Sequence, residues 1–208
     1  MRVTAIQKQR REGRVNLYLD GRFALGLTLD ASAAAGLRAG DEIDEDTLRS
    51  LRREAGGADA LAAAMRLLSY RPRSEAELRQ RLARRGAPAD IVDGAISRLR
   101  ELGLVDDAAF ARAWVEGRSR LSPRSRRLLR RELQAKGIGG DAAHEALAPL
   151  DDEDAAIRAG ERRAAATRGL PRPEFRRRLG ELLRRRGFDA ETARRTVERL
   201  WRDGDRSD

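Results

Sequence analysis

The chain has 208 residues and no cysteine, which excludes disulfide bonds, cysteine-ligated zinc and thiol catalysis. Charged residues make up 38% of it and aromatic residues only 4%, so the core must be aliphatic and much of the surface ionic. The net charge of +10 favours an anionic partner, either nucleic acid or an acidic protein surface. A GC-rich genome would explain why arginine replaces lysine, but it leaves the net excess unexplained. Without a long apolar run or a signal peptide, we expect a cytoplasmic protein that spans no membrane.

Three short runs with strand character open the chain, at residues 3–6, 14–19 and 22–28. Asp20-Gly21 separates the last two and is a strong hairpin signal, because both positions tolerate positive φ. Glu12-Gly13 marks the earlier turn. The sequence therefore predicts a three-stranded antiparallel meander, followed by a short helix at 31–37. A bare meander is marginal in water, so we expect it to pack on helices.

The next segment, residues 44–54, has helical spacing of its apolar residues and acidic residues in its first turn. Gly56-Gly57 is expected to break this helix. The sequence thus predicts an N-terminal domain at 1–57 that combines the meander with this helix.

The rest of the chain repeats the pattern Leu-x-x-x-Leu-x-x-x-Gly three times. The pattern occurs at Leu78, Leu82 and Gly86, at Leu129, Leu133 and Gly137, and at Leu179, Leu183 and Gly187. Its glycines lie 51 and 50 positions apart, a period typical of repeated supersecondary units. We predict three repeats of three helices each, at 58–104, 105–150 and 151–208. The predicted fold is mainly α, with these repeats in a curved array after the small β-meander.

Helix-start signals support this division. Ser74 and Glu77 form a capping-box pattern before the second helix of the first repeat. Asp106-Asp107 and Ser122-Pro123 are placed to start the first two helices of the second repeat. Asp189 is placed to cap the last helix of the chain.

Catalysis has little support in the sequence. The single histidine, His144, falls in the middle of a predicted helix and is best explained by packing or surface exposure. Asp106 and Asp107 do not face each other on a helix, and capping accounts for both. No phosphate-binding glycine loop is present. We therefore predict a non-enzymatic protein with no catalytic residues, no metal site and no cofactor.

A basic run lacks acidic residues from Gly117 to Arg131. Its arginines are Arg118, Arg120, Arg124, Arg126, Arg127, Arg130 and Arg131. The run spans a predicted helix end, a turn and the next helix start, where backbone amides also favour anions. Arginine offers a planar fork for carboxylate or phosphate oxygens. The run is a candidate binding surface, and the competing interpretation is a merely solvated face.

A second basic patch follows in the third repeat, diluted by nearby Glu174 and Glu181. Its arginines are Arg176, Arg177, Arg178, Arg184, Arg185 and Arg186. Phe110 and Trp114, four positions apart, are better explained as core residues than as stacking platforms for bases. Trp201 is placed to cover the end of the repeats.

Three strings resemble the RecX family of regulatory proteins. They are Arg-x-Arg-Ser-x-x-Glu-Leu-x-x-x-Leu at 71–82, Glu-Leu-Gly-Leu-Val-Asp-Asp-Ala-Ala-Phe-Ala-x-x-Trp-x-x-x-Arg at 101–118, and Leu-x-x-Lys-Gly-Ile at 133–138. The resemblance covers residues 58–202, and the second string is the most specific. The N-terminal meander resembles the extension of longer family members.

The resemblance implies a monomeric negative regulator of RecA that acts in DNA repair, recombination and the SOS response. Such a protein binds the groove of the RecA filament, inhibits ATP hydrolysis and strand exchange, limits filament growth and promotes filament disassembly. It also implies weak, nonspecific affinity for single- or double-stranded DNA. The alternative is a DNA-binding protein whose repeats act as helix-turn-helix readers without RecA.

Overall fold

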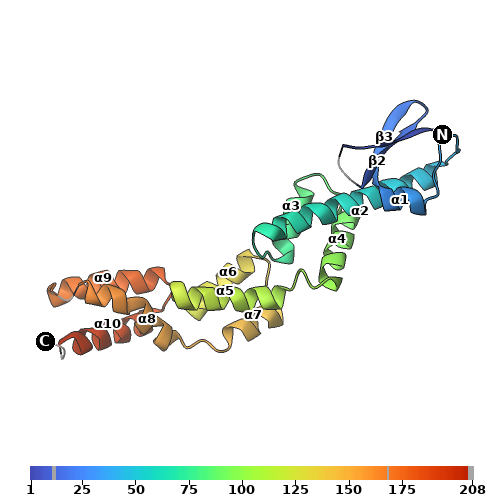
Figure 1. Ribbon diagram of the computed structural model, residues 1–208. Helices are drawn as coiled ribbons and strands as arrows, with labels where there is room; N and C mark the ends of the chain where they lie inside the picture. The colour runs from blue at the N-terminus through green and yellow to red at the C-terminus, as the bar shows by residue number, and fades with distance from the viewer. Residues whose placement is uncertain (11–12, 168, 206–208) are drawn as a thin grey trace. The chain divides into compact units, whose positions relative to one another are not determined.

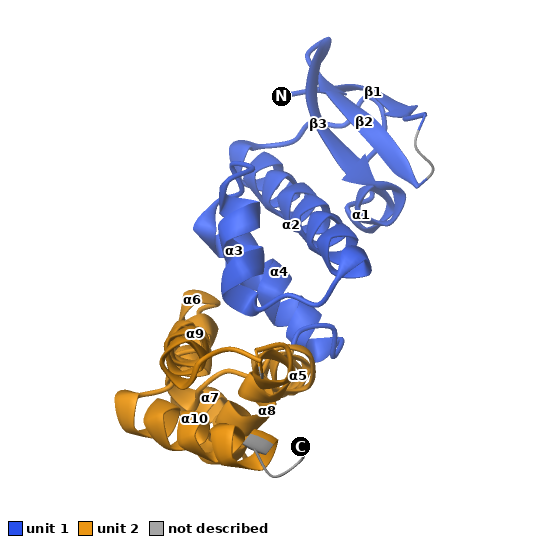
Figure 2. Cartoon of the chain, turned by 90° about the vertical axis from the view of Figure 1, so that its left-hand side faces the viewer, with its two compact units in different colours: residues 1–105 blue, residues 106–208 orange. Residues whose placement is uncertain are grey.

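The computed structural model describes residues 1–10, 13–167 and 169–205 of the chain. The protein consists of two compact units, residues 1–105 (unit 1) and 106–208 (unit 2), which Figure 2 colours separately. Unit 1 contains the sheet and one helical repeat, and unit 2 contains two helical repeats. Each unit buries two clusters of mainly aliphatic side chains, and Phe175 and Phe188 are buried in the last of them.

The N-terminal sheet of unit 1 has the predicted meander topology. Strands β1 (Val3–Lys8), β2 (Arg14–Leu19) and β3 (Arg22–Thr28) pair antiparallel in the order β1-β2-β3. Asp20 and Gly21 adopt positive φ values of 48° and 79° at the predicted hairpin. Glu12, in the predicted first turn, lies outside the described residues. Helix α1 (Leu29–Ala34) takes the place of the helix predicted at 31–37, and the Thr28 side chain caps it.

One long helix, α2 (Glu45–Tyr70), connects the sheet with the first repeat (Figure 1). The predicted break at Gly56-Gly57 is therefore wrong. Two glycines inside a helix cost roughly 2 kcal/mol relative to alanine. Both halves of α2 nevertheless bury side chains, Leu48 and Leu51 in the core shared with the sheet and Ala64 in the core of the first repeat. Packing at both ends keeps the helix continuous despite its local propensity.

The second half of α2 is the first helix of repeat one. Helices α3 (Glu75–Ala83) and α4 (Ala89–Glu101) complete the repeat. The Ser74 hydroxyl accepts a hydrogen bond of 3.3 Å from the Glu77 backbone N–H, so α3 starts where the capping pattern predicts. Gly86 ends this segment with a φ of 82°. An ion pair between Arg14 of β2 and Asp59 of α2 joins the sheet to the repeat.

Unit 2 contains the other two repeats (Figure 2). Its helices are α5 (Asp107–Leu121), α6 (Arg126–Ala135), α7 (Gly140–Leu147), α8 (Asp152–Ala165), α9 (Arg172–Arg185) and α10 (Ala190–Asp205). Asp106 accepts from the Ala109 backbone N–H at 2.9 Å and Asp189 from that of Thr192 at 2.8 Å, as their predicted capping roles require. Trp201 packs edge-on against Phe175 at 5.1 Å and closes the last core. The predicted fold of three three-helix repeats after a small meander is confirmed.

Candidate partner-binding surface

The acid-free basic run of unit 2 lies on a helix corner. It covers the last turns of α5, the loop 122–125 and the first half of α6. The Ser125 hydroxyl accepts a 3.1 Å hydrogen bond from the Leu128 backbone N–H and thereby fixes the start of α6. The predicted start at Ser122-Pro123 is wrong, because Ser122 ends α5 instead. The loop is therefore a defined turn between two helices, and most arginines of the run project from the helices on either side of it.

Two arginines of the run are held inside their own repeat by Glu132. This carboxylate is 16% exposed and follows the run by one residue. It pairs with Arg124, lies 3.4 Å from Arg118, and accepts a 3.0 Å hydrogen bond from the Trp114 indole N–H. The Arg118 guanidinium also lies 4.5 Å from the centre of the Trp114 ring, a cation–π distance. Glu132 thus ties α5 to α6, and Arg118 and Arg124 have intramolecular partners.

Two further arginines connect repeat two with repeat three. The Arg126 guanidinium donates to the Leu150 carbonyl, and its backbone N–H donates to Asp152 at 2.7 Å. The Arg127 guanidinium donates to the Gly187 carbonyl at 3.1 Å. Both side-chain acceptors are neutral carbonyls, so neither of these hydrogen bonds pairs a guanidinium with a carboxylate.

The junction between these repeats also explains the third glycine of the repeated pattern. The Ser125 backbone N–H donates to the Arg186 carbonyl at 3.0 Å, and the Arg186 guanidinium donates to Ser122. Gly187 has a φ of 87°, and a Cβ built there would lie 2.6 Å from both the Leu128 Cβ and the Ser125 Oγ. Only glycine lets the two repeats approach this closely.

Arg186 sits in a strongly cationic environment. Burial lowers its pKa, and the neighbouring Arg124 and Arg185 lower it further. The two basic patches predicted from the sequence therefore meet at this junction, where Arg124 of the first comes within electrostatic range of Arg186 of the second.

The remaining arginines of the run face solvent. Arg120, Arg130 and Arg131 are exposed, and in the described part of the chain they make no ion pair. Arg127, Arg130 and Arg131 are spaced i, i+3, i+4 on α6, opposite the buried Leu129 and Leu133. We call these three residues the outer face of α6. Like Arg120, these three residues can contact a partner without breaking an ion pair of the chain.

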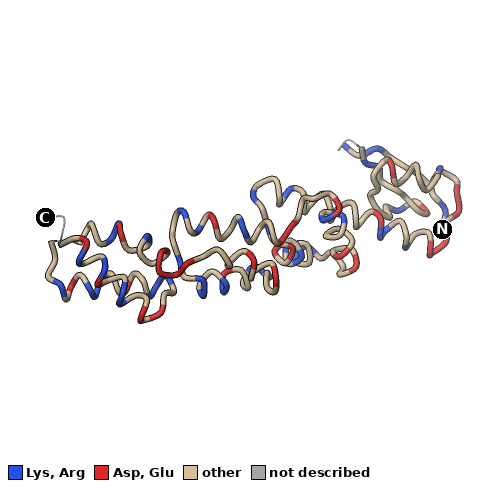
Figure 3. The backbone as a smooth tube through the Cα atoms, turned by 90° about the horizontal axis from the view of Figure 1, so that it is seen from below, with Lys and Arg blue, Asp and Glu red and all other residues tan. Residues whose placement is uncertain are grey.

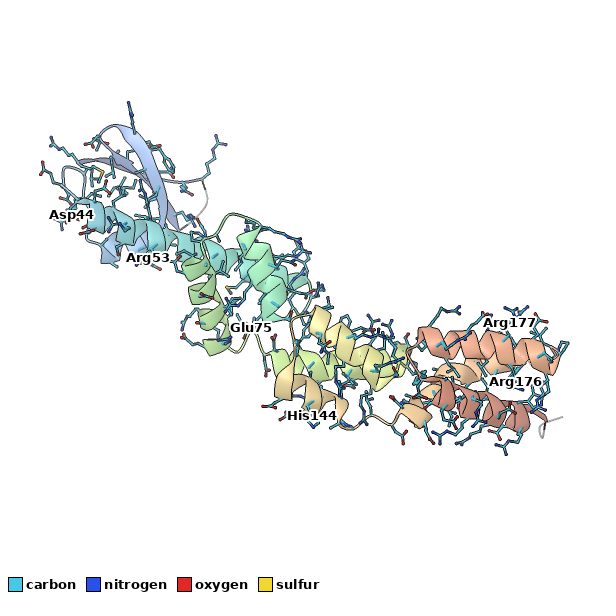
Figure 4. The ribbon with its side chains drawn as sticks, turned by 180° about the vertical axis from the view of Figure 1, so that it is seen from behind. Asp44, Arg53, Glu75, His144, Arg176 and Arg177 are labelled. Carbon is cyan, nitrogen blue, oxygen red and sulfur yellow. The ribbon has the colours of Figure 1, made fainter. Side chains whose placement is uncertain are left out.

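The second basic patch is more strongly compensated. On α9, Arg176 pairs with Glu198 at 3.3 Å and Arg177 with Glu181 at 3.2 Å (Figure 4). Arg178 pairs with Glu174. Arg184 and Arg185 are exposed and have no ion pair among the residues that the structure describes. Figure 3 shows the same interleaving of basic and acidic positions along both units.

A shallow groove of about 230 Å³ runs between α9 and α10. Gly180, Ala193 and Val197 form part of its lining, together with Arg176, Arg177, Arg184 and Arg194. Arg194 pairs with Glu191 at 2.8 Å, so most of the arginines around the groove already have carboxylate partners. The groove is therefore a weaker candidate for anion binding than the outer face of α6.

The described residues include no cluster of side chains that could hold a metal ion. His144 lies exposed on α7 (Figure 4). Over residues 1–10, 13–167 and 169–205, no three His, Cys, Asp or Glu side chains are grouped to hold a metal ion. Among the described helices, none combines the length and apolarity needed to cross a membrane. The charged surfaces of the helices are therefore the candidate functional sites.

Repeated three-helix units with arginine-rich surface helices define a tandem helical-repeat protein. Family models match four parts of the chain: a regulatory protein RecX N-terminal domain at 1–44, and the first, second and third RecX three-helix domains at 60–99, 106–147 and 151–197. The chain belongs to the RecX family of regulatory proteins.

Individual relatives agree with this assignment. The regulatory protein RecX of Thermobifida fusca is 41% identical over 143 residues, which cover 67% of this chain and 77% of the relative. That of Lactobacillus gasseri is 29% identical over 201 residues, covering 95% and 74%.

Two solved structures share the fold. A crystal structure of regulatory protein RecX aligns with a TM-score of 0.71 at 24% identity and covers 97% of this chain and 98% of its own. The crystal structure of RecX from Lactobacillus salivarius aligns at 0.60 and 21% identity, covering 70% and 96%.

Proposed function

We propose that the chain is a non-enzymatic negative regulator of RecA in the cytoplasm. As a monomer it binds in the groove of the RecA–DNA filament, inhibits ATP hydrolysis and strand exchange, and limits filament growth. Affinity for DNA alone is weak and nonspecific. No cofactor or metal takes part.

The observation that carries this proposal is the outer face of α6 in a chain of the RecX family. Arg130 and Arg131 are exposed, carry uncompensated charge, and stand on a helix that Ser125 and the Arg186 carbonyl hold in place. A filament supplies both acidic protein surface and DNA phosphates, and the planar guanidinium fork suits the oxygens of either. Several repeats that contact one filament at once raise the overall affinity beyond that of a single repeat.

The test is ATP hydrolysis by RecA on single-stranded DNA, titrated with the full chain. Wild type is expected to inhibit, and Arg130→Glu/Arg131→Glu is expected to need a concentration higher by on the order of tenfold, because two exposed attractive contacts become repulsive. Arg162→Glu/Arg163→Glu on α8 is the matched control, since both residues are exposed and the change in net charge is the same. The control is expected to inhibit like wild type. Equal losses in both variants would show that only net charge matters and would remove the α6 assignment.

The alternative, a DNA-binding protein that acts without RecA, predicts a different result. The oriented start of α6 and its arginines are the features that favour it. It requires sequence preference among duplexes in the absence of RecA, whereas phosphate binding alone is nonspecific and falls steeply with salt. Titration against random and selected duplexes at two salt concentrations separates the two. Strong preference for one sequence, with RecA hydrolysis unaffected, would replace the proposed function by this alternative.

A further inference from the structure

Two large apolar side chains are far more exposed than any other in the described part of the chain. Tyr70 is 84% exposed and Leu121 is 79% exposed, while the next, Phe23, is 59% exposed. Single exposed apolar residues are common and need no explanation. These two differ from that background because they occupy the same position of two repeats.

The repeat register makes this equivalence strict. The residues of the repeated pattern in repeats one and two, Leu78 and Leu129 among them, lie 51 positions apart, and so do Tyr70 and Leu121. Each is the last residue of the first helix of its repeat. In repeat three, 50 positions further, stands Pro171, so only two repeats carry this feature.

The chain leaves the helix in a similar way at the two positions. The residue that follows each is a C-cap with a similar φ, −168° at Arg71 and −159° at Ser122, although ψ differs, 156° against 70°. A Pro-Arg-Ser sequence comes next in both repeats, and its serine caps the following helix. Each apolar side chain therefore projects from a short, well-defined corner, and little backbone entropy is lost when it is buried.

The chemistry shared by the two positions restricts the partner. Tyrosine could stack on a nucleic-acid base, but leucine has no π face and gains nothing from stacking. Both are large apolar side chains, and transfer of such a side chain from water into an apolar pocket is favourable. Arg120 adjoins Leu121, is exposed and makes no ion pair in the described part of the chain, whereas Arg71, beside Tyr70, pairs with Glu77 at 3.0 Å. An apolar pocket of a protein is complementary to both corners, and a carboxylate near its rim would add to binding only at Leu121.

We propose that Tyr70 and Leu121 are equivalent anchors that fill the same kind of apolar pocket on two subunits of a repeating protein partner. The inference rests on the proposed function, because a RecA filament presents one pocket many times. Full burial of one such side chain corresponds to roughly tenfold to a hundredfold in affinity. Joined in one chain, the two anchors reinforce each other, since binding of the first raises the effective concentration of the second.

The test uses the full chain and compares replacement of an anchor by serine, which removes the apolar side chain, with replacement of Tyr70 by leucine, which keeps it apolar. Binding to preformed RecA filaments on single-stranded DNA is measured for Tyr70→Ser, Leu121→Ser, Tyr70→Leu and the control Phe23→Ser. Both anchor-to-serine variants are expected to bind tenfold or more weakly, with the salt dependence unchanged because no charge is altered. Tyr70→Leu is expected to stay within about threefold of wild type, since leucine serves the equivalent position. The control is expected to match wild type, and thermal unfolding of all variants checks that these exposed changes leave the fold intact.

Several results would refute the proposal that Tyr70 and Leu121 are anchors. One is wild-type affinity in both serine variants while wild type itself binds and inhibits, an outcome that leaves the proposed function standing. Another is a loss in Tyr70→Leu as large as in Tyr70→Ser, matched by lost affinity for DNA alone, which would identify Tyr70 as a base-stacking residue. If the wild-type chain forms a dimer and Leu121→Ser dissociates it, Leu121 mediates self-association and is not an anchor for the filament. Failure of the wild-type chain to bind filaments at all would instead refute the proposed function.

Discussion

Gly187 offers a sharp test of how repeats two and three are joined. Replacement by alanine places a Cβ on a residue with a φ of 87°, a conformation that costs an L-residue about 1–2 kcal/mol. The new Cβ would also lie 2.6 Å from the Leu128 Cβ and the Ser125 Oγ, and the first of these is fixed to the α6 backbone. Forcing such a contact apart costs a further 1–3 kcal/mol or so. The expected loss of stability is therefore about 2–5 kcal/mol.

The same pattern supplies the controls. Gly137 and Gly86 have φ values of 76° and 82°, but a Cβ at either meets nothing within 4 Å. Their alanine variants should lose only the 1–2 kcal/mol or so of backbone strain.

The assay is urea unfolding followed by tryptophan fluorescence. Both tryptophans, Trp114 and Trp201, lie in unit 2, so the signal reports this unit. Gly187→Ala should lower the midpoint clearly more than Gly137→Ala, and Gly86→Ala, in unit 1, should leave the tryptophan transition in place. Equal midpoints for Gly187→Ala and Gly137→Ala would refute the close approach of the two repeats.

Three further predictions concern the polar contacts of the repeats. Glu132→Ala should destabilise unit 2 by about 1–3 kcal/mol, because it leaves the Trp114 N–H and two partly buried guanidiniums without their acceptor; an unchanged urea midpoint would contradict this. Hydrogen bonding from Arg172 lowers the pKa of Glu198, so the folded chain keeps this carboxylate ionised to lower pH than the unfolded chain does. Its contribution is then complete above about pH 4.3, the ordinary glutamate value, and is lost as the pH falls through the lower folded pKa. Wild type should therefore exceed Glu198→Gln in stability at pH 6 by more than at pH 3, and a constant difference would count against the ion pair. Ser74→Ala should cost unit 1 about 1 kcal/mol through loss of the α3 cap, as measured by thermal unfolding, and no loss would mean that water replaces the hydroxyl.

Local signals predicted most of the fold. Alternation at 14–19, the Asp20-Gly21 hairpin and the caps at Ser74, Asp106 and Asp189 each act within a few residues, and each is found in the structure. The prediction failed at Gly56-Gly57, where packing on both sides of α2 outweighs a local preference. The division into four domains stays a prediction.

The candidate binding surface was less accessible to sequence reasoning. The run without acidic residues supplied seven candidate arginines, yet Glu132, one residue beyond the run, pairs with Arg118 and Arg124. The proximity of Glu132 was a visible signal. No local signal could have shown that Arg127 donates a hydrogen bond within the chain, because its acceptor is the Gly187 carbonyl, 60 residues away. Which arginines bind a partner stays a prediction.

The sequence by itself determined the positions of most helices and strands, that three units repeat, and that the chain carries excess positive charge. These properties follow from periodicity and capping among residues near one another in the sequence, and from composition, so they do not depend on how the chain packs. Only the tertiary structure decided which arginines are engaged internally, why Gly187 must be glycine, and that Tyr70 and Leu121 remain in water. These depend on distances between residues far apart in the chain, and such distances are set by the packing of whole helices.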